Sequence, residues 1–324
     1  ISACLVGSEM CIRDRAMTKQ PVLHIENVDK IIDGKTILKD IRLTADEGEI
    51  IGLLGPNGSG KTTLIKLITG LIKMKSGSIV INGFPIDRQF EKAIRSVGAI
   101  VENPEFYPYL TGYENLKHYA NMHAGIGRDR LAEVISRVGL EDAAEDKVKT
   151  YSLGMKQRLG IAQAILHRPK LLILDEPTNG LDPAGMKDFR EHLRELAEEE
   201  GTAILFATHL LKEVEDLCDR VVILQQGKIK STVDLNDADE KQEKAMLEVQ
   251  PHDKALQWLK DQGYEAHAEK GLLTVKVAKA EIPALNQQLV ANHIDVYSIA
   301  PFKQSLEDEY MARTNGTEER NADV

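Results

Sequence analysis

The chain has 324 residues, with 41 Lys and Arg against 51 Asp and Glu, a formal net charge of −10 at pH 7, and 42% hydrophobic residues. This composition excludes collagen-like, coiled-coil and disordered chains, and the acidic balance argues against a nucleic acid bound through bulk charge. No stretch approaches the roughly 20 apolar residues that a membrane-spanning helix needs, which leaves soluble enzymes as the class to consider.

Two of the three cysteines, Cys4 and Cys11, lie near the start of the chain. Residues 1–16 have no charged region followed by an apolar run, so they do not resemble a signal peptide. We interpret them as a non-native leader before Met17; a genuine disordered N-terminus is the alternative. Cys218 is then the only cysteine left, and one cysteine builds neither a disulfide framework nor a metal cage. Cytoplasmic residence is expected.

Strands and helices alternate along the following 200 or so residues. Strands are predicted at 22–28, 36–44, 49–54, 78–81, 99–101, 171–174, 203–206 and 221–224, and helices at 62–69, about 111–123, 129–138, about 153–167, 186–199 and 210–217. The run 49–54 is almost continuously apolar, which is typical of a strand buried on both faces of a parallel sheet. Thr111 and Glu114 form a capping box, and Gly139 is placed to end a helix. The alternation predicts an α/β fold.

The composition changes at residues 234–244, where charged residues and Asn exclude a core and predict a linker. Beyond it, strands are predicted at 246–249, 264–268, 273–277 and 296–299, and helices at 254–262 and 282–291. The resulting β-α-β-β-α-β order predicts a small ferredoxin-like α+β unit. It has no residue spacing typical of catalysis, and residues 313–324 are expected to form a polar tail.

A phosphate-binding motif lies between the buried strand at 49–54 and the helix at 62–69. It consists of Gly55, Pro56, Asn57, Gly58, Ser59, Gly60, Lys61 and Thr62, which fit G-x-x-x-x-G-K-[ST] in full. Its glycines let successive backbone N–H groups turn toward one point and bind an anion. Lys61 is expected to reach the β- and γ-phosphates, Thr62 to offer its hydroxyl to Mg²⁺, and Thr63 to contact the α-phosphate. The motif predicts a bound nucleoside triphosphate rather than an ordinary Gly-rich turn.

Two carboxylates follow the apolar strand at 171–174. Asp175 is expected to hold Mg²⁺ through water, and Glu176 to orient or deprotonate the attacking water. Two carboxylates at a strand end are by themselves more often a helix N-cap pair, so this interpretation depends on their combination with Lys61. His209 follows another core strand and suits a sensor of the γ-phosphate, with a structural histidine as the alternative.

Residues 151–158, Tyr-Ser-Leu-Gly-Met-Lys-Gln-Arg, lie about twenty positions before Asp175. They resemble the L-S-G-G-Q signature of the nucleotide-binding subunits of ATP-binding-cassette (ABC) transporters, with Ser152 and Gly154 at the essential positions. The looser form of the motif is similar to that of exporters related to bacitracin resistance and lantibiotic immunity. Residues 177–183 resemble the D-loop region of the same family, with Asp182 as its namesake.

The resemblance covers residues 22–233 and implies a fold and a set of boundaries. It implies a P-loop NTPase ABC ATPase domain at 17–235 with an inserted helical subdomain at about 104–168. A linker at 236–244 then leads to an accessory C-terminal domain at 245–312, similar to that of many bacterial exporter ATPases. ATP and Mg²⁺ are the implied cofactors. In this family the signature residues face the P-loop of a second protomer, which implies a homodimer or a pair with a similar ATPase.

Two positions depart from the usual family pattern. Ile31 and Ile32 stand where an aromatic residue usually stacks on adenine, so an aliphatic contact replaces stacking. Glu102 stands where most members carry a glutamine near Mg²⁺ and the membrane partner, and it is expected to act as a metal-site and catalytic residue. Bacitracin and lantibiotic-immunity exporters resemble this chain in having glutamate there.

The resemblance implies an ATP-hydrolysing subunit that powers a separate transmembrane permease. The expected transporter is an exporter of a peptide antibiotic or a related substrate, and the subunit is expected on the cytoplasmic face of the plasma membrane through that permease. The alternative is a soluble regulatory or sensing ABC ATPase that is not engaged in transport. Soluble members usually carry two cassettes in one chain, and this sequence has one copy of each motif. No nucleic-acid partner is expected.

Overall fold

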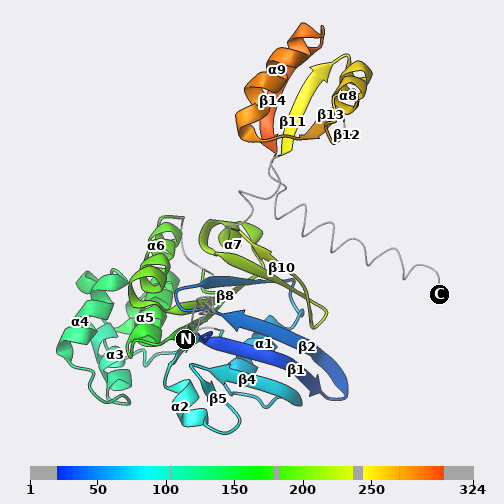
Figure 1. Cartoon of the computed structure of the whole chain (residues 1–324). Helices are drawn as coiled ribbons and strands as arrows, with labels where there is room; N and C mark the ends of the chain where they lie inside the picture. The colour runs from blue at the N-terminus through cyan, green and yellow to red at the C-terminus, as the bar shows by residue number, and fades with distance from the viewer. Residues whose placement is uncertain (1–19, 103, 179–182, 236–243, 270, 303–324) are drawn as a thin grey trace, which may run out of the picture.

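The computed structural model describes residues 20–102, 104–178, 183–235, 244–269 and 271–302 (Figure 1). Residues 20–235 carry two sheets, and residues 244–302 carry a third. The predicted leader at 1–16 and the tail at 313–324 lie outside the described residues, as does most of the predicted linker at 236–244. None of the described helices has both the length and the apolar character needed to cross a membrane.

The larger sheet has six strands in the order β10-β9-β3-β8-β7-β6. These strands are β3 (Ile50–Leu54), β6 (Val97–Ile100), β7 (Leu171–Asp175), β8 (Ala203–Thr208), β9 (Arg220–Gln225) and β10 (Lys228–Asp234). All neighbours pair in parallel except β10, which lies antiparallel to β9 at the edge. Every residue of β3, β7 and β8 is buried, which confirms the predicted parallel sheet covered on both faces.

The two faces of this sheet pack against different layers, because alternate residues of a strand point to opposite sides. Ile50 and Leu54 of β3 belong to one core, together with α5 (Leu153–Ile165), α6 (Pro183–Glu200) and α7 (Leu211–Leu217). Ile51 and Leu53 belong to a second core, together with α1 (Lys61–Ile68) and an antiparallel sheet. That sheet contains β1 (Leu23–Ile32), β2 (Lys35–Ala45), β4 (Ser76–Ile81) and β5 (Phe84–Pro85), in the order β2-β1-β4-β5.

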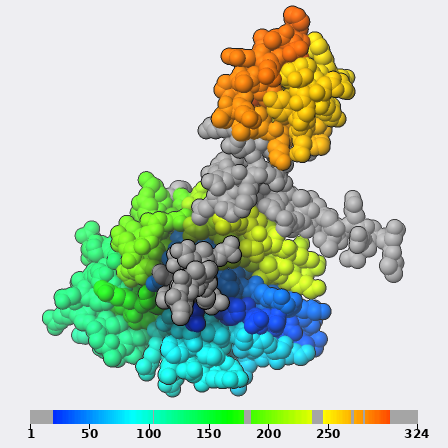
Figure 2. All heavy atoms as spheres, in the orientation of Figure 1, coloured from blue at the N-terminus to red at the C-terminus, as the bar shows by residue number. Residues whose placement is uncertain are grey.

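A helical region lies between β6 and β7 in the sequence, with α3 (Gly112–Ala120), α4 (Arg128–Arg137) and α5. The predicted capping box begins α3: the Glu114 N–H donates to the Thr111 hydroxyl at 3.1 Å, and the Thr111 N–H donates to the Glu114 carboxylate at 2.9 Å. Gly139 has a φ of +61°, the left-handed conformation expected just after a helix. Figure 2 shows α3 and α4, in blue-green, and the antiparallel sheet, in blue and cyan, on different sides of one body.

Some predicted boundaries were wrong by a few residues. The helix α3 ends at Ala120 rather than near His123, because the N–H groups of Met122 and His123 bond to carbonyls three residues back and form turns. The helix α5 ends at Ile165 rather than near His167, since Pro169 disfavours a helical conformation in the residue before it. The sequence analysis did not predict the strands β5 and β10 or the short helix α2 (Phe90–Ile94).

The C-terminal part, as far as the described residues 244–269 and 271–302 show it, has four strands and two α-helices: β11 (Lys244–Gln250), α8 (His252–Asp261), β12 (Ala266–Glu269), β13 (Leu272–Lys276), α9 (Ile282–Ala291) and β14 (Asp295–Phe302). The antiparallel sheet has the order β12-β13-β11-β14, which confirms the predicted ferredoxin-like unit. Leu247, Leu273 and Leu289 lie in its core, whose members all come from this part of the chain. The strand β11 begins at Lys244, which had been assigned to the linker.

Candidate functional site

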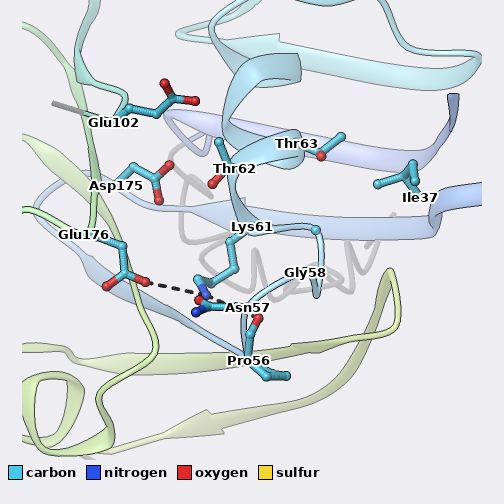
Figure 3. A pocket seen from close by; sticks show the side chains of 11 residues that line it. Ile37, Pro56, Asn57, Gly58, Lys61, Thr62, Thr63, Glu102, Asp175 and Glu176 are labelled. Atoms are coloured by element: carbon cyan, nitrogen blue, oxygen red, sulfur yellow. Dashed lines mark hydrogen bonds and ion pairs between the residues drawn. The ribbon is translucent and has the colours of Figure 1, made fainter.

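A cavity of about 500 Å³ lies where β3, β6 and β7 end, at the carboxyl edge of the parallel sheet. Ligands of open α/β sheets usually bind at this edge. We call it the P-loop cavity. It is lined by Ile37, Pro56, Asn57, Gly58, Gly60, Lys61, Thr62, Thr63, Glu102, Asp175 and Glu176 (Figure 3).

The turn between β3 and α1 needs its glycines. Gly58 and Gly60 have φ values of +79° and +112°, a backbone conformation that residues other than glycine rarely adopt. A Cβ on Gly55 would clash with the carbonyl oxygen of Leu224. The helix α1 then begins at Lys61 with Gly60 as its N-cap, a residue that has no side chain to satisfy the first N–H groups. The end of this helix is therefore available to an anion, as the motif predicts.

Lys61 is held inside the turn. Its ammonium donates to the Gly55 carbonyl at 2.7 Å and lies 3.6 Å from the Glu176 Oε1 atom, and its side chain is only 6% exposed. The two contacts place a positive charge between the turn and the end of β7. A lysine placed there acts as a point charge for phosphate oxygens, which agrees with the role expected for it.

Asp175 ends β7 and is 4% exposed. Within the described residues, its Oδ1 atom is buried without a hydrogen-bond partner. Burial raises the pKa of this carboxyl above its usual range, and the charges of Glu176 and Glu102 add to this effect; a hydrogen bond from Thr62 and the charge of Lys61 oppose it. A buried oxygen that lacks a partner, beside a hydroxyl, is the kind of donor set that Mg²⁺ binds. The residues present therefore fit the expected metal.

Glu176 and His209 form a hydrogen-bonded pair at the ends of adjacent strands. The His209 Nδ1 atom lies 2.9 Å from Glu176 Oε2, and the Thr208 hydroxyl lies 3.4 Å from the same oxygen. Glu176 has a φ of +48°, and its N–H donates to the Ala207 carbonyl at 2.9 Å. The backbone and the histidine thus fix the direction of the Glu176 carboxylate, which suits a group that orients or deprotonates a water molecule.

Glu102 follows β6 and lies at the rim of the P-loop cavity, as Figure 3 shows. Its side chain is 65% exposed, and its Oε1 atom accepts a hydrogen bond from the Lys66 ammonium at 2.8 Å. This hydrogen bond and the positive charge of Lys66 hold the pKa of Glu102 below its usual value. The sequence analysis did not identify Lys66, which matches no motif and lies 36 residues from Glu102.

Neither of the two residues expected to contact the base lines the P-loop cavity. Ile37 of β2 lines the P-loop cavity, whereas the sequence analysis had chosen Ile31 and Ile32. Ile32 lies at the end of β1 and is 40% exposed. Ile37 is one of several apolar residues in an alternating strand, so its sequence position gave no signal that distinguished it.

The signature residues are not part of the P-loop cavity of their own chain. Ser152 caps α5, and its hydroxyl accepts the Met155 N–H at 3.2 Å. Gly154 lies in the first turn of the same helix, and neither residue lines the cavity. Asp182 lies outside the described residues. The structure therefore brings together the phosphate, metal and water-activating residues, and leaves Ser152 and Gly154 apart from them.

Comparisons with known proteins agree with this geometry. Residues 38–179 match the ABC transporter family. The ABC transporter ATP-binding protein YdbJ of Bacillus subtilis (strain 168) is 64% identical over 94% of this chain and 99% of its own length. The bacitracin transport ATP-binding protein BcrA of Bacillus licheniformis is 38% identical over 91% of this chain and 98% of its own. The lantibiotic transport ATP-binding protein SrtF of Streptococcus pyogenes is 41% identical over 64% of this chain and 89% of its own.

Solved structures give the same result. The ATP-binding subunit of an ABC transporter superposes with a TM-score of 0.62 and 34% identity, over 67% of this chain and 91% of that chain. The dimeric ATP-binding cassette MJ0796, bound to ADP and Pi, superposes with a TM-score of 0.60 and 27% identity, over 66% and 98% of the two chains. The fold class and the family resemblance are both confirmed. This chain belongs to the ABC transporter ATP-binding proteins, the ATP-hydrolysing subunits of these transporters.

Proposed function

We propose that the P-loop cavity binds ATP with Mg²⁺ and that hydrolysis there drives a separate membrane permease. The observation that carries this proposal is the convergence of Lys61, Thr62, Asp175 and Glu176 on one cavity at the end of the parallel sheet. His209 joins them through its hydrogen bond to Glu176. These residues supply a cation that binds phosphate, two oxygen donors for a metal and an oriented carboxylate. Each of these groups has a role in phosphoryl transfer to water.

The polar residues of the site have separate tasks in this proposal. The turn of residues 55–60 and Lys61 hold the phosphates, and Thr63 contacts the α-phosphate. Thr62 and Asp175 hold Mg²⁺, which when bound neutralises charge on the phosphate oxygens. Glu176 accepts a proton from the attacking water, and His209 keeps the Glu176 carboxylate in position while its exposed edge reaches the γ-phosphate. Glu102 would bind the water shell of the metal from the rim of the cavity.

The separation of Ser152 and Gly154 from the cavity supports a dimer. A second protomer would present its own Ser152, Gly154 and Asp182 to the nucleotide bound by the first, with the start of α5 directed at the γ-phosphate. The similarity to MJ0796, a dimeric cassette, favours this arrangement. One copy of each motif per chain makes two equivalent sites in a homodimer, and a pair with a similar ATPase is the alternative.

The proposed transporter is an exporter of a peptide antibiotic or a related molecule. The similarity to BcrA extends over 98% of that relative, so it includes the C-terminal part as well as the cassette. Glu102 in place of the usual glutamine also supports this substrate class. The subunit would lie on the cytoplasmic face of the membrane, held there by its permease. BcrA and SrtF are named as transport proteins, which favours this role over a soluble regulatory ATPase.

We also propose the division of the chain that the sequence suggests. The ATPase domain spans 17–235 with its helical subdomain at about 104–168, and the accessory domain follows a linker at 236–244. The accessory domain spans 245–312, although its first strand, β11, begins one residue earlier at Lys244. Residues 313–324 are proposed as a tail. Separate hydrophobic cores for the two parts support this division.

The proposed chemistry is tested by Glu176→Gln. The variant should bind ATP normally, because Lys61 and the P-loop remain, and should lose hydrolysis by at least about 10²-fold, the usual scale for loss of a general base. With ATP it should elute as a dimer. ATPase rates, nucleotide binding and size-exclusion profiles of the purified proteins measure these effects.

Glu91→Gln, on the exposed surface of α2, is the matched control and should hydrolyse ATP normally. Near-normal turnover of Glu176→Gln with the permease present would assign the base to another residue. In cells that carry the permease, Glu176→Gln should also abolish resistance to the exported antibiotic, and resistance that persists would contradict the transport role.

A further inference from the structure

Lys66 is a charged neighbour of the P-loop cavity that the mechanism above does not use. We propose that Lys66 is a positioning residue for the metal site: it binds one oxygen of the Glu102 carboxylate and leaves the other oxygen directed to the water shell of Mg²⁺. This inference rests on the metal site proposed above, and extends it to a residue outside the cavity lining.

The position of Lys66 on α1 places it beside the metal-binding hydroxyl. Lys66 follows Thr62 by four residues in the same helix, and residues at this spacing lie on one face. From that face its ammonium reaches Glu102 at 2.8 Å. One helix therefore supplies the hydroxyl expected at the metal and the cation that holds the nearby carboxylate, so both are fixed to the same rigid element.

Glu102 needs such an anchor. Its φ of +64° is a left-handed conformation that is uncommon for a residue with a side chain. Its side chain is 65% exposed, and without a partner it would sample several rotamers and lose entropy when it meets the metal. The ion pair with Lys66 restricts this freedom before the nucleotide binds. Figure 3 shows the Glu102 and Asp175 carboxylates on the same side of the cavity, next to Thr62.

The chemistry of the carboxylate permits both interactions at once. An ionised carboxylate has two oxygens and about four lone-pair sites, so an ammonium on Oε1 leaves Oε2 free to accept from a metal-bound water. An amide at this position has one oxygen only; with Lys66 bound to it, its NH₂ group would face the metal. A glutamate at position 102 and a lysine at position 66 therefore work together.

The charge balance gives a second reason for the pair. Asp175, Glu176 and Glu102 place three carboxylates on one cavity. Repulsion among like charges disfavours three ionised carboxylates in one place. Lys66 offsets this third negative charge from outside the cavity, where its ammonium does not occupy space that the nucleotide needs.

The variant Lys66→Met in the full-length chain tests the inference, with ATP binding as the readout. The Mg²⁺ concentration that gives half-maximal ATP binding should rise by about two- to tenfold, the range that ordering one flexible side chain accounts for. ATP binding in EDTA should stay unchanged, because the Lys66 ammonium bonds to Glu102 and the residues of the P-loop turn remain. Lys66→Arg should restore the normal Mg²⁺ dependence, and Lys117→Met, on the exposed face of α3, should leave it unaffected.

A double variant shows whether the effect passes through Glu102. Glu102→Ala alone should raise the Mg²⁺ concentration that gives half-maximal ATP binding. Lys66→Met should not raise it further in that background. A normal Mg²⁺ dependence in Lys66→Met, or a full additional effect in the double variant, would overturn the inference and leave the proposed metal site standing. If ATP binding by the unaltered protein is insensitive to Mg²⁺, both the metal site and the inference are wrong.

Discussion

Asp175 is a single residue whose role in the site lowers the stability of the folded protein. Its carboxylate is buried, one of its oxygens has no partner among the described residues, and its pKa is raised mainly by burial. A charged group in this environment destabilises the protein until a cation arrives. Such a group persists in a functional protein because the binding of its partner recovers the lost free energy.

We therefore expect Asp175→Asn to raise the melting temperature of the nucleotide-free protein by several degrees at neutral pH. The folded-state pKa of Asp175 lies above its unfolded value of 3.8, so the penalty is present when the pH is above the folded pKa and disappears as the pH falls through it toward 3.8. The gain from the variant should accordingly shrink in acid. Thermal unfolding from about pH 7.5 down to about pH 4 measures both trends.

The same variant should lose the stabilisation that Mg²⁺ and ATP give to the unaltered protein. An asparagine variant that melts no higher than the original at neutral pH would show that the carboxylate is already compensated in the free protein. Glu198→Gln, an exposed change on α6, controls for the loss of one negative charge.

Sequence motifs predicted the residues of the site better than their contacts. Lys61, Thr62 and Asp175 each lie in a local pattern whose backbone geometry fixes their place, and the structure brings them together. The pairing of Glu176 with His209 joins two strand ends, and the pairing of Glu102 with Lys66 joins a loop to a helix. Such contacts depend on the order of strands in the sheet and on rotamers, which no local pattern contains.

At the scale of single elements, the start of α3 is the most sharply defined boundary. Both hydrogen bonds of its capping box are present, so Thr111→Ala should destabilise the protein by about 1 kcal/mol, the typical loss for an N-cap. In a protein of this size the melting temperature should fall by about 2–4 °C. Thr111→Ser keeps the hydroxyl and should retain most of the stability. Equal losses for the two variants would mean that the methyl group, not the cap, matters.

The elements that the sequence failed to predict are short or lie at edges. The strand β10 lies at the edge of its sheet and is partly exposed. It therefore needs few large apolar residues and has only Ile229 and Val233, too few for a strand pattern to be recognised. The helix α2 has five residues, fewer than a helical pattern needs for recognition. Buried strands such as β3 and β7 were predicted because burial on both faces requires a continuous apolar run.

At the scale of the whole molecule, the chain is organised around separate cores. The strand β3 contributes to both cores of residues 20–235, which makes these layers one cooperative unit. The core of the C-terminal part contains residues of that part alone. Leu235, the last described residue before the gap, packs against the first core, and its N–H donates to the Asp219 carbonyl at 2.8 Å. The N-terminal unit thus extends through Leu235.

A chain that ends at Leu235 should fold and bind ATP with an affinity within about twofold of the full chain, because the residues of the P-loop cavity and its two supporting cores lie before this point. A chain that ends at Gly227 should be unstable, since it lacks β10, exposes the edge of β9 and loses the Leu235 contact. Melting curves and nucleotide titrations of the two truncated proteins make this comparison. If the longer protein is insoluble and nucleotide does not rescue it, the two parts of the chain depend on each other for folding, and the core of residues 20–235 is incomplete without residues beyond 235.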